Sequence, residues 1–544
     1  MTILLPPIEQ SDRIPLAGAA RFGSWTAAVL AVTLLALALR SMAINQHSFW
    51  YDEAVAAELI QSSYADLYRG IARDNGNPPL YWLLAKAWST FFGASEVAMR
   101  TLPALCGILT VPLMAILGRR LLNPTAGLFA AVLLAISPLA IELSNEARTY
   151  ALQELLVVAS TLLLIRWLDH RRVMDWLLYA ISMYLACLTH YYTFVLPLAH
   201  AVGLVVGGTS RRVLVAWFAA MSVAALLWLP WLPTFAQQLH TPGNLARGGQ
   251  YWQRQFFATP IIFGLGRTFA WRDSSKALLA LAMAISLAGF WVPALWALVQ
   301  LRRRLLAGAM LAVLLLLPIL GPLIVALTLA PLYHVRAASV ALPAFLLLAA
   351  FGLSVTRLHL RNALLVVILA FTAISLYGYA TRPLKDDWRS ATPILLQNTR
   401  PDEPLVFDTA IEITSCSYYL RKAGPMPPEM IGLTSAPTES ADLLGIRYLN
   451  GRRMDRDLQS YTEHITSAPG LWLILCVPAG TWPQYEKLFT QHGYVLDKSH
   501  HFHRIDLYHL TKPLAYPQPS PALRLAAARR AGLAIDHATA LSIR

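Results

Sequence analysis

Long apolar runs separated by short polar connections dominate the first 380 or so residues of the chain. Crossing the hydrocarbon layer of a bilayer takes roughly 20 mostly apolar residues in a helix, and runs of about this length recur throughout this part. The pattern predicts a mainly α-helical, polytopic membrane protein with eleven spans. They are 24–43, 100–118, 125–143, 149–165, 176–190, 193–209, 213–232, 277–299, 306–329, 338–356 and 362–380.

Every second connection between these spans is basic. The basic connections carry Arg119 and Arg120, Arg166 with Arg171 and Arg172, Arg211 and Arg212, Arg302 to Arg304, and Arg357 with Arg361. Cytoplasmic loops of membrane proteins carry an excess of Lys and Arg, so we expect these connections and the N-terminus to be cytoplasmic. The opposite side then holds a long first loop at about 44–99, a loop at 233–276 and everything after about 381.

Two segments of the first loop, Glu53–Tyr68 and Pro79–Phe92, have helical apolar spacing. Both contain aromatic residues, which is typical of helices that lie in the membrane interface. The second is long enough to be mistaken for a span, but counting it would move the arginine-rich connections to the outside. We therefore predict two interfacial helices in this loop.

From about residue 383 the composition becomes that of a soluble domain. Strands are predicted at Leu405–Phe407 and Leu471–Val477, a helix at Pro483–His492, and further strands at Tyr494–Asp497 and Arg504–His509. This alternation predicts a small α/β domain. The chain would then consist of a membrane domain at 1–382, a soluble domain at 383–515, and a tail at 516–544 to which we assign no role.

Composition supports a membrane protein and argues against nucleic-acid binding and against a cysteine-based zinc or redox motif. Charged residues make up 14% of the chain, whereas soluble proteins carry about 25%. The net charge of +14 comes largely from arginines in the cytoplasmic connections, so we expect no nucleic-acid partner. The four cysteines form no CxxC pair, which argues against a zinc ribbon or a redox motif. Cys416 and Cys476 in the soluble part either form a disulfide or remain two buried thiols.

The strongest candidate for chemistry is the pair Asp52 and Glu53, which follows the first span within a run of aromatic residues. Carboxylates at the depth of a membrane interface are costly unless they are used. A structural interpretation stands beside the catalytic one. Asp52 would be the N-cap of the following helix, and Glu53 would be an acid favoured in its first turn.

A second candidate stands at the entry to the fourth span. Glu146, Tyr150 and Glu154 are spaced four apart and would share one helical face. Arg148 points elsewhere and could pair with Asp52, Glu53 or a phosphate. Glu154 falls about a turn inside the hydrocarbon zone, where a carboxylate must face a cavity or a partner. Sequence alone equally supports a cluster of salt bridges at a helix start.

Further polar and cationic residues fall on the same side of the membrane. They are His190, Tyr191 and Tyr192 after the fifth span, Tyr333, His334 and Arg336 before the tenth, and Arg267, Arg272 and Lys276 before the eighth. Cations at this depth suit an anionic ligand such as a lipid phosphate. An aromatic belt accounts for the tyrosines but less well for the histidine, and some of the cations would serve equally well for lipid headgroups.

Several short runs, taken in order and spacing, resemble a known family. They are Phe49–Glu53, Asn77–Trp82, Met99–Pro103, Gly118–Arg120, Asn145–Ala151, Thr189–Tyr192 and Asp387–Arg389. The chain resembles bacterial membrane glycosyltransferases of the C-type (GT-C) fold in the protein-mannosyltransferase-like superfamily. That group includes lipid A aminoarabinose transferases and lipopolysaccharide-core galacturonosyltransferases. The similarity covers roughly residues 45–200 well and the rest mainly by layout.

The resemblance implies transfer of a sugar from a polyprenyl-phosphate donor, on the periplasmic side of a bacterial inner membrane. The family's first-loop acid corresponds to Asp52, and its acid at the fourth span corresponds to Glu146 or Glu154. The arginine near the tenth span corresponds to Arg336, a candidate phosphate contact. The aminoarabinose transferases have a phosphate-binding lysine where this chain has Asn77, so phosphate binding would fall to other cations or be weaker.

The function predicted from these features is inverting sugar transfer, with Asp52 as general base and Glu53 and Glu146 as further catalytic candidates. The acceptor would be lipopolysaccharide, another glycolipid, a polysaccharide or a protein of the envelope. No cofactor is expected to be required, although carboxylates and His190 are suitable ligands for a divalent cation. The main alternative is a transporter or flippase of lipid-linked saccharides. Transporters usually place charged groups at mid-membrane in repeated, broken helices, and no repeat is evident here.

Overall fold

The computed structural model describes most of the chain, in segments. They are residues 19–74, 77–240, 252–269, 275–329, 333–382, 385–409, 411–424, 429–432, 465, 467–476 and 482–513. The predicted tail at 516–544 and the candidate Arg272 lie outside these residues. The chain divides into two compact units, one built mainly from residues up to Arg389 and the other mainly from Ser390 onward.

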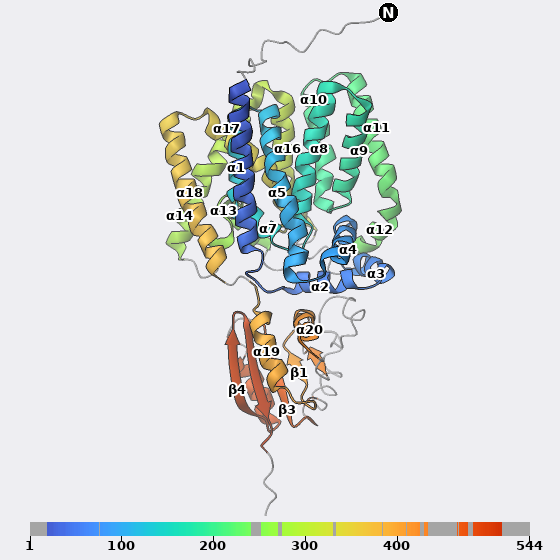
Figure 1. The fold of residues 1–544 in the computed structure, drawn as a ribbon, viewed down its shortest axis with the longest axis vertical. Coiled ribbons are helices and arrows are strands. Elements are labelled where there is room, and N and C mark those ends of the chain that lie inside the picture. The colour runs from blue at the N-terminus through green and yellow to red at the C-terminus, as the bar shows by residue number, and fades with distance from the viewer. Residues whose placement is uncertain are drawn as a thin grey trace, which may run out of the picture. The chain divides into compact units, whose positions relative to one another are not determined.

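The first unit is a bundle of long apolar helices (Figure 1). Eight helical segments in the described part are long and apolar enough to cross a membrane. They are α1 (Ala19–Ala43), α5 (Glu96–Leu121), α8 (Tyr150–His170), α11 and α12 (Arg211–Trp228 and Leu232–His240), α14 and α15 (Lys276–Ser286 and Val292–Gln300), α16 (Leu305–Thr328), α17 with the preceding η8 (Leu342–Val355 and Ala337–Ala341), and α18 (Leu358–Thr381).

The remaining predicted spans also correspond to helices. A ninth span consists of α6 (Pro124–Ile136) and α7 (Pro138–Ser144), which meet at a bend of 59°. Two shorter apolar segments are α9 (Val173–Cys187) and η2 with α10 (Tyr191–Phe194 and Val195–Val206). Each of the eleven predicted spans therefore coincides with a helical segment, and the prediction of a polytopic helical bundle is confirmed.

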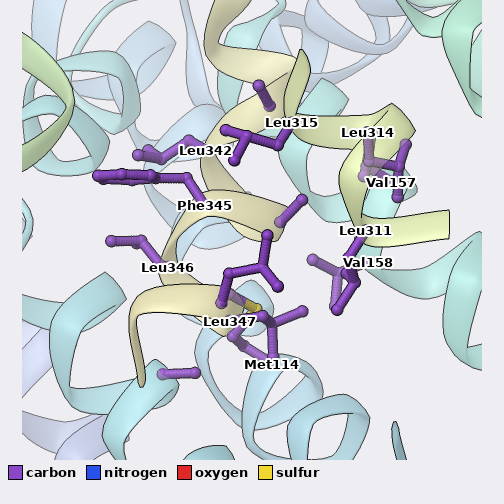
Figure 2. Packing of buried hydrophobic residues seen from close by; sticks show 14 of the residues in the cluster. Met114, Val157, Val158, Leu311, Leu314, Leu315, Leu342, Phe345, Leu346 and Leu347 are labelled. Atoms are coloured by element: carbon purple, nitrogen blue, oxygen red, sulfur yellow. The ribbon is translucent and has the colours of Figure 1, made fainter. Parts of the chain in front are cut away.

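Helix α17 lies in the interior of this bundle. Its side chains from Leu342 to Leu353 are all buried. Figure 2 shows Phe345 and Leu347 of α17 among leucines of α16, valines of α8 and Met114 of α5. Burying so many apolar side chains fixes the position of α17, and with it the turn at residues 333–336 that leads into η8.

The long first loop folds into three helices, not the two that were predicted. These are α2 (Tyr51–Gln61), α3 (Tyr64–Asp74) and α4 (Leu80–Phe92), and α2 and α3 lie across one end of the bundle (Figure 1). The expected helix Glu53–Tyr68 breaks at Ser62, whose backbone is extended. Ser63 then accepts a hydrogen bond from the backbone N–H of Asp66, so it caps α3.

The second unit contains a five-stranded sheet of order β2-β1-β3-β5-β4. Strand β1 (Leu405–Phe407) lies between β2 (Met430–Gly432) and β3 (Gly470–Leu475) and is parallel to both. Strand β5 (Ile505–Thr511) is antiparallel to its two neighbours, β3 and β4 (Val495–Phe502). The predicted strands and the helix α23 (Trp482–Gln491) are present, so the α/β prediction is confirmed. Strand β2, α19 (Trp388–Asn398) and α20 (Glu412–Ala423) were not predicted.

Cys416 and Cys476 are both buried, and the choice between a disulfide and two thiols for this pair stays a prediction.

Candidate active site

Asp52 lies in the first turn of α2 and faces an arginine from another loop. The N-cap position of α2 is Trp50, and the helix begins at Tyr51, so the hypothesis that Asp52 is the N-cap is wrong. One Asp52 carboxylate oxygen is 3.7 Å from Nη2 of Arg148, and its side chain is 28% exposed. Asp52 is thus an accessible carboxylate held beside a buried cation.

Glu53, the next residue, is fully buried and heavily hydrogen-bonded. Arg100 donates to both of its carboxylate oxygens at 2.8 Å, Lys385 donates at 2.8 Å, and the backbone N–H of Ala147 donates at 3.0 Å. Burial alone would raise the pKa of the Glu53 carboxyl, but the charges of Arg100 and Lys385 outweigh it and lower the pKa to about 2. Glu53 is therefore an ionised anchor between three segments of the chain.

Arg100 and Lys385 were not predicted as site residues. Besides Glu53, Arg100 donates hydrogen bonds to the backbone carbonyls of His47 at 2.6 Å and Ser48 at 3.1 Å. It therefore fixes the backbone that leads from α1 into α2. An arginine buried at the outer end of a predicted span needs such a partner, and that signal could have identified Arg100. Lys385 follows the last membrane helix, and nothing in its local sequence points to Glu53.

The second acidic residue, Glu146, lies in the turn between α7 and α8. Since α8 begins at Tyr150, the expectation that Glu146 shares a helical face with Tyr150 and Glu154 is wrong. Glu146 is buried, with an oxygen 3.3 Å from Nη2 of Arg336 and 4.0 Å from Nζ of Lys385. Lys385 thus stands between Glu53 and Glu146.

Three arginines lie around these acids, of which Arg148 is buried and Arg336 and Arg267 are partly buried. Arg148 lies over the ring of Trp82 at 5.7 Å, Arg336 lies over the ring of Trp50 at 4.3 Å, and Arg267 pairs with Glu142 at 3.2 Å. Among the described residues, the Nε atom of each of the three has no hydrogen-bond partner. Buried polar atoms nearly always have one, so these N–H groups are suited to an anionic ligand.

Trp82 and Trp50 hold the guanidinium groups of Arg148 and Arg336, respectively, by cation–π contacts. Burial alone would lower the pKa of Arg336, but the carboxylates of Glu146 and Glu142 outweigh it and raise the pKa. His334 lies close to the charged groups of Arg336 and Arg267. Its pKa is well below the usual range because of burial and because of the nearby charges of Arg336 and Arg267, so it is neutral at physiological pH.

Other predicted residues lie at the edge of this cluster or serve the fold. The His190 ring is 5.9 Å from that of Tyr150 and accepts a hydrogen bond from the backbone N–H of Tyr192. Tyr191 hydrogen-bonds Gln238 and Trp231, and Tyr333 hydrogen-bonds Thr259 at 2.6 Å. Asn77 and Glu154 are buried. Lys276 begins α14 at its exposed end.

A second polar cluster supports the turn that carries Glu146 and Arg148. Arg40 of α1 is fully buried and donates hydrogen bonds to the carbonyl of Ala135 at 3.2 Å and to Oγ of Ser144 at 3.1 Å. These two acceptors stand on either side of the bend between α6 and α7. The helical hydrogen-bond ladder is interrupted at this bend, and Arg40 supplies a donor to the carbonyl of Ala135 near the end of α6.

Within the part of the chain that the structure describes, no group of three or more His, Cys, Asp or Glu side chains is arranged to hold a metal ion. The charged site is instead made of carboxylates paired with arginine and lysine.

Residues 76–233 match the family model described as dolichyl-phosphate-mannose-protein mannosyltransferase. The matched region includes Glu146 and Arg148 but not Asp52 or Arg336. The fold is that of solved membrane transferases. This part of the chain is similar to that transferase family, so the predicted resemblance is confirmed over these residues. No curated protein matches the chain at a significant level.

Two solved structures illustrate the similarity of fold. ArnT from Cupriavidus metallidurans, bound to undecaprenyl phosphate, aligns with a TM-score of 0.58 and 14% identity, over 91% of this chain and 98% of ArnT. The archaeal oligosaccharyltransferase AglB from Archaeoglobus fulgidus, in complex with an inhibitory peptide and a dolichol-phosphate, aligns with a TM-score of 0.54 and 13% identity. That alignment covers 92% of this chain and 76% of AglB.

Proposed function

We propose that the protein transfers a sugar from a polyprenyl-phosphate donor to a hydroxyl group of an envelope acceptor. The acceptor is lipopolysaccharide, another glycolipid, a polysaccharide or a protein. The observation that carries the proposal is the partly exposed carboxylate of Asp52 beside Arg148, in a site where the Nε atoms of Arg148, Arg336 and Arg267 have no hydrogen-bond partner among the described residues. The ArnT structure with undecaprenyl phosphate supports a lipid-linked phosphate as the ligand.

Asp52 acts as the general base. A carboxylate is too weak a base to ionise an alcohol beforehand, by roughly 16 kcal/mol. Asp52 therefore takes the acceptor's proton while the new bond to the anomeric carbon forms, a contribution of about 10²- to 10⁴-fold. The acceptor oxygen attacks from the face opposite the phosphate, so the bond to the phosphate oxygen breaks as the new one forms and the configuration inverts.

The leaving phosphate is stabilised by charge and needs no proton. Arg148, Arg336 and Arg267 have N–H groups available for phosphate oxygens, and guanidinium groups bind phosphate in a fixed, forked geometry. Their positions are set before the donor arrives, by Trp82, Trp50 and Glu142 respectively. Preorganised charges of this kind stabilise the negative charge that develops on a leaving group.

Glu53 acts through position and not by contact with the substrate. Its oxygens already accept four hydrogen bonds, so it offers little to a sugar or a proton. It holds Asp52, the next residue toward the N-terminus, against the turn that carries Arg148. Glu146, whose carboxylate oxygens accept no hydrogen bond from the described residues, is available to orient the substrate.

The reaction takes place on the face opposite the basic connections. With those connections in the cytoplasm, Asp52 and its surrounding arginines belong to the periplasmic side of the inner membrane, where the second unit also resides. This is the side on which lipid-linked sugars would meet envelope acceptors.

The test is a transfer assay with purified protein in lipid vesicles. The donors are undecaprenyl phosphates carrying radiolabelled sugars, and the acceptor is an envelope fraction from a strain that lacks the protein. We expect label to move into the envelope fraction and Asp52→Asn to reduce the rate by about 10²-fold or more. The matched control is Asp66→Asn, which removes an exposed first-loop carboxylate on α3 and should leave transfer intact. Full activity in a correctly inserted Asp52→Asn protein would remove Asp52 from the mechanism.

A further inference from the structure

Several neutral polar groups around the candidate active site lack partners. Among the described residues, no hydrogen bond is made by Nε1 of Trp50, by the hydroxyl of Tyr81, or by either side-chain polar atom of Asn145, and all of these atoms are buried. Trp50 lies against Arg336, Asn145 precedes Glu146, and Tyr81 lies within the electrostatic reach of Arg148 and Glu53. Uncharged donors and acceptors of this kind suit sugar hydroxyl groups.

The ionised groups of the same site, in contrast, are already matched with one another. Asp52 faces Arg148 at 3.7 Å, Glu146 faces Arg336 at 3.3 Å, and Glu142 faces Arg267 at 3.2 Å. Glu53 has two cations, Arg100 and Lys385, each at 2.8 Å. Lys385 is also the second cation beside Glu146, at 4.0 Å. Among the described residues, these ion pairs join four carboxylates to five cations, and the surplus is a single positive charge.

This arrangement discriminates against charge on the sugar. An ammonium group that approached Glu146 would come close to Arg336 and Lys385, and a carboxylate that approached Arg148 would come close to Asp52. The one surplus cation is matched by the single negative charge of a phosphodiester linking the sugar to its lipid. A charged sugar would leave a net charge in a buried site, where it is costly.

We propose that the transferred sugar is itself uncharged, a neutral hexose or pentose and neither an amino sugar nor a uronic acid. The proposal rests on the function proposed above. It adds the chemical class of the sugar, which is recognised through hydroxyl contacts to Trp50, Tyr81, Asn145 and Glu146.

The test compares donors that differ only in the charge of the sugar. Undecaprenyl phosphates carrying glucose, glucosamine and glucuronic acid share the lipid, the phosphate and the ring. The same comparison with galactose, galactosamine and galacturonic acid ensures that the result does not depend on the configuration of a single hydroxyl group. Binding to the purified protein in lipid vesicles is measured by the change in tryptophan fluorescence, with undecaprenyl phosphate and the uncharged alcohol undecaprenol as references.

We expect the neutral-sugar donor to bind at least about tenfold more tightly than either charged analogue, because placing like charges together costs several kcal/mol. An amino or uronic acid donor that bound as tightly as its neutral parent would overturn the proposal. If undecaprenyl phosphate bound no better than undecaprenol, the proposed function itself would be wrong, which is a distinguishable result.

A charge variant makes the test independent of sugar shape. Lys385→Met removes the surplus cation, whereas Lys385→Arg keeps it. In Lys385→Met the preference for glucose over glucosamine should fall several-fold, and in Lys385→Arg the ratio should stay as in the unmodified protein. Because a ratio of two donors is compared within one protein, a general loss of binding does not affect it. An unchanged ratio in a folded Lys385→Met protein would contradict the charge argument.

Discussion

The Lys385 ammonium group donates a hydrogen bond of 2.8 Å to the carboxylate of Glu53 and so ties the segment after the last membrane helix to the long first loop. Arg100 completes this contact from the start of α5 with two further bonds of 2.8 Å. The three residues come from parts of the chain separated by 47 and 332 positions. The backbone around Asp52 therefore depends on an ion cluster that only the complete fold assembles.

Replacing Glu53 tests whether this ion cluster stabilises the fold. Glu53→Gln leaves Arg100 and Lys385 buried without their shared counter-charge, which typically costs about 3–5 kcal/mol. We expect a clear fall in the melting temperature of the purified protein, larger than the fall in Asp52→Asn, since Asp52 is partly exposed and its ion pair with Arg148 is long, at 3.7 Å. Equal melting temperatures in the two variants would show that the cluster does not support the fold.

The pH dependence of stability follows from the same carboxylate. In the folded protein, the charges of Arg100 and Lys385 outweigh the effect of burial and lower the pKa of the Glu53 carboxyl from its usual 4.5 to about 2. A carboxyl whose pKa is lowered by folding contributes stability that is present above its unfolded pKa and is lost as the pH falls through the folded pKa. His47 acts in the same direction, because burial first and then Lys385 and Arg100 lower its pKa from 6.5 to about 4. A histidine that is buried in its neutral form lowers the stability of the folded protein once the pH falls below the pKa that this histidine has in the unfolded chain.

Stability should therefore decrease as the pH is lowered from about 6.5 toward 2, with the histidine contributing first. Thermal unfolding of the purified protein at a series of pH values measures this. In His47→Gln the dependence between pH 6.5 and 4 should be weaker, whereas the part below pH 4.5 should persist. A protein whose melting temperature did not change over this range would contradict both assignments.

Arg336 offers a test of phosphate binding. Arg336→Lys keeps the positive charge but loses the planar fork and the stacking on Trp50. Because a hydrogen bond to a charged group contributes about 1.5–3 kcal/mol, binding of undecaprenyl phosphate should weaken by roughly 10- to 100-fold. Arg69→Lys on α3, where the arginine is exposed, is the matched control and should bind normally. Unchanged binding in Arg336→Lys would remove this arginine from the phosphate site.

Much of the fold could be predicted from the sequence because the relevant signals are local. Each span is a continuous apolar run, and the strand Leu405–Phe407 was found with the bounds it has in the structure. The break at Ser62 was missed because apolar spacing continues across it, while the cap formed by Ser63 depends on one side-chain hydrogen bond. Glu146 was misplaced onto a helix for a similar reason, since its spacing fits a helix that begins only at Tyr150.

From the sequence, the residues of the candidate site could be predicted better than the role of each residue. Asp52, Arg148 and Arg336 carry charge where charge is expensive, and that cost marks them in the sequence. Sequence could not separate Asp52 from Glu53, which are adjacent but differ in burial and bonding. The difference arises from Lys385 and Arg100, whose contacts with Glu53 span long stretches of chain. Such contacts follow from tertiary packing, and no spacing rule contains them.

Arg40 provides the last prediction. It is fully buried in α1 and bridges the bend between α6 and α7 by binding the carbonyl of Ala135 and the hydroxyl of Ser144. The bend sets the direction of α7 and hence the position of the following turn with Glu146 and Arg148. In Arg40→Met we expect lower stability, and a fall in kcat for transfer that exceeds any change in the donor KM. The reason is that a misplaced turn disturbs the alignment of the reacting groups more than the lipid contacts.

The control for this prediction is Arg40→Lys. A lysine has three donors and can reach one of the two acceptors but not both sides of the bend, because it lacks the guanidinium fork. Partial recovery of kcat relative to Arg40→Met would indicate that the hydrogen bonds across the bend matter, and not only the buried charge. If both variants kept the kcat of the unmodified protein while melting at a lower temperature, Arg40 would support the fold without positioning the turn.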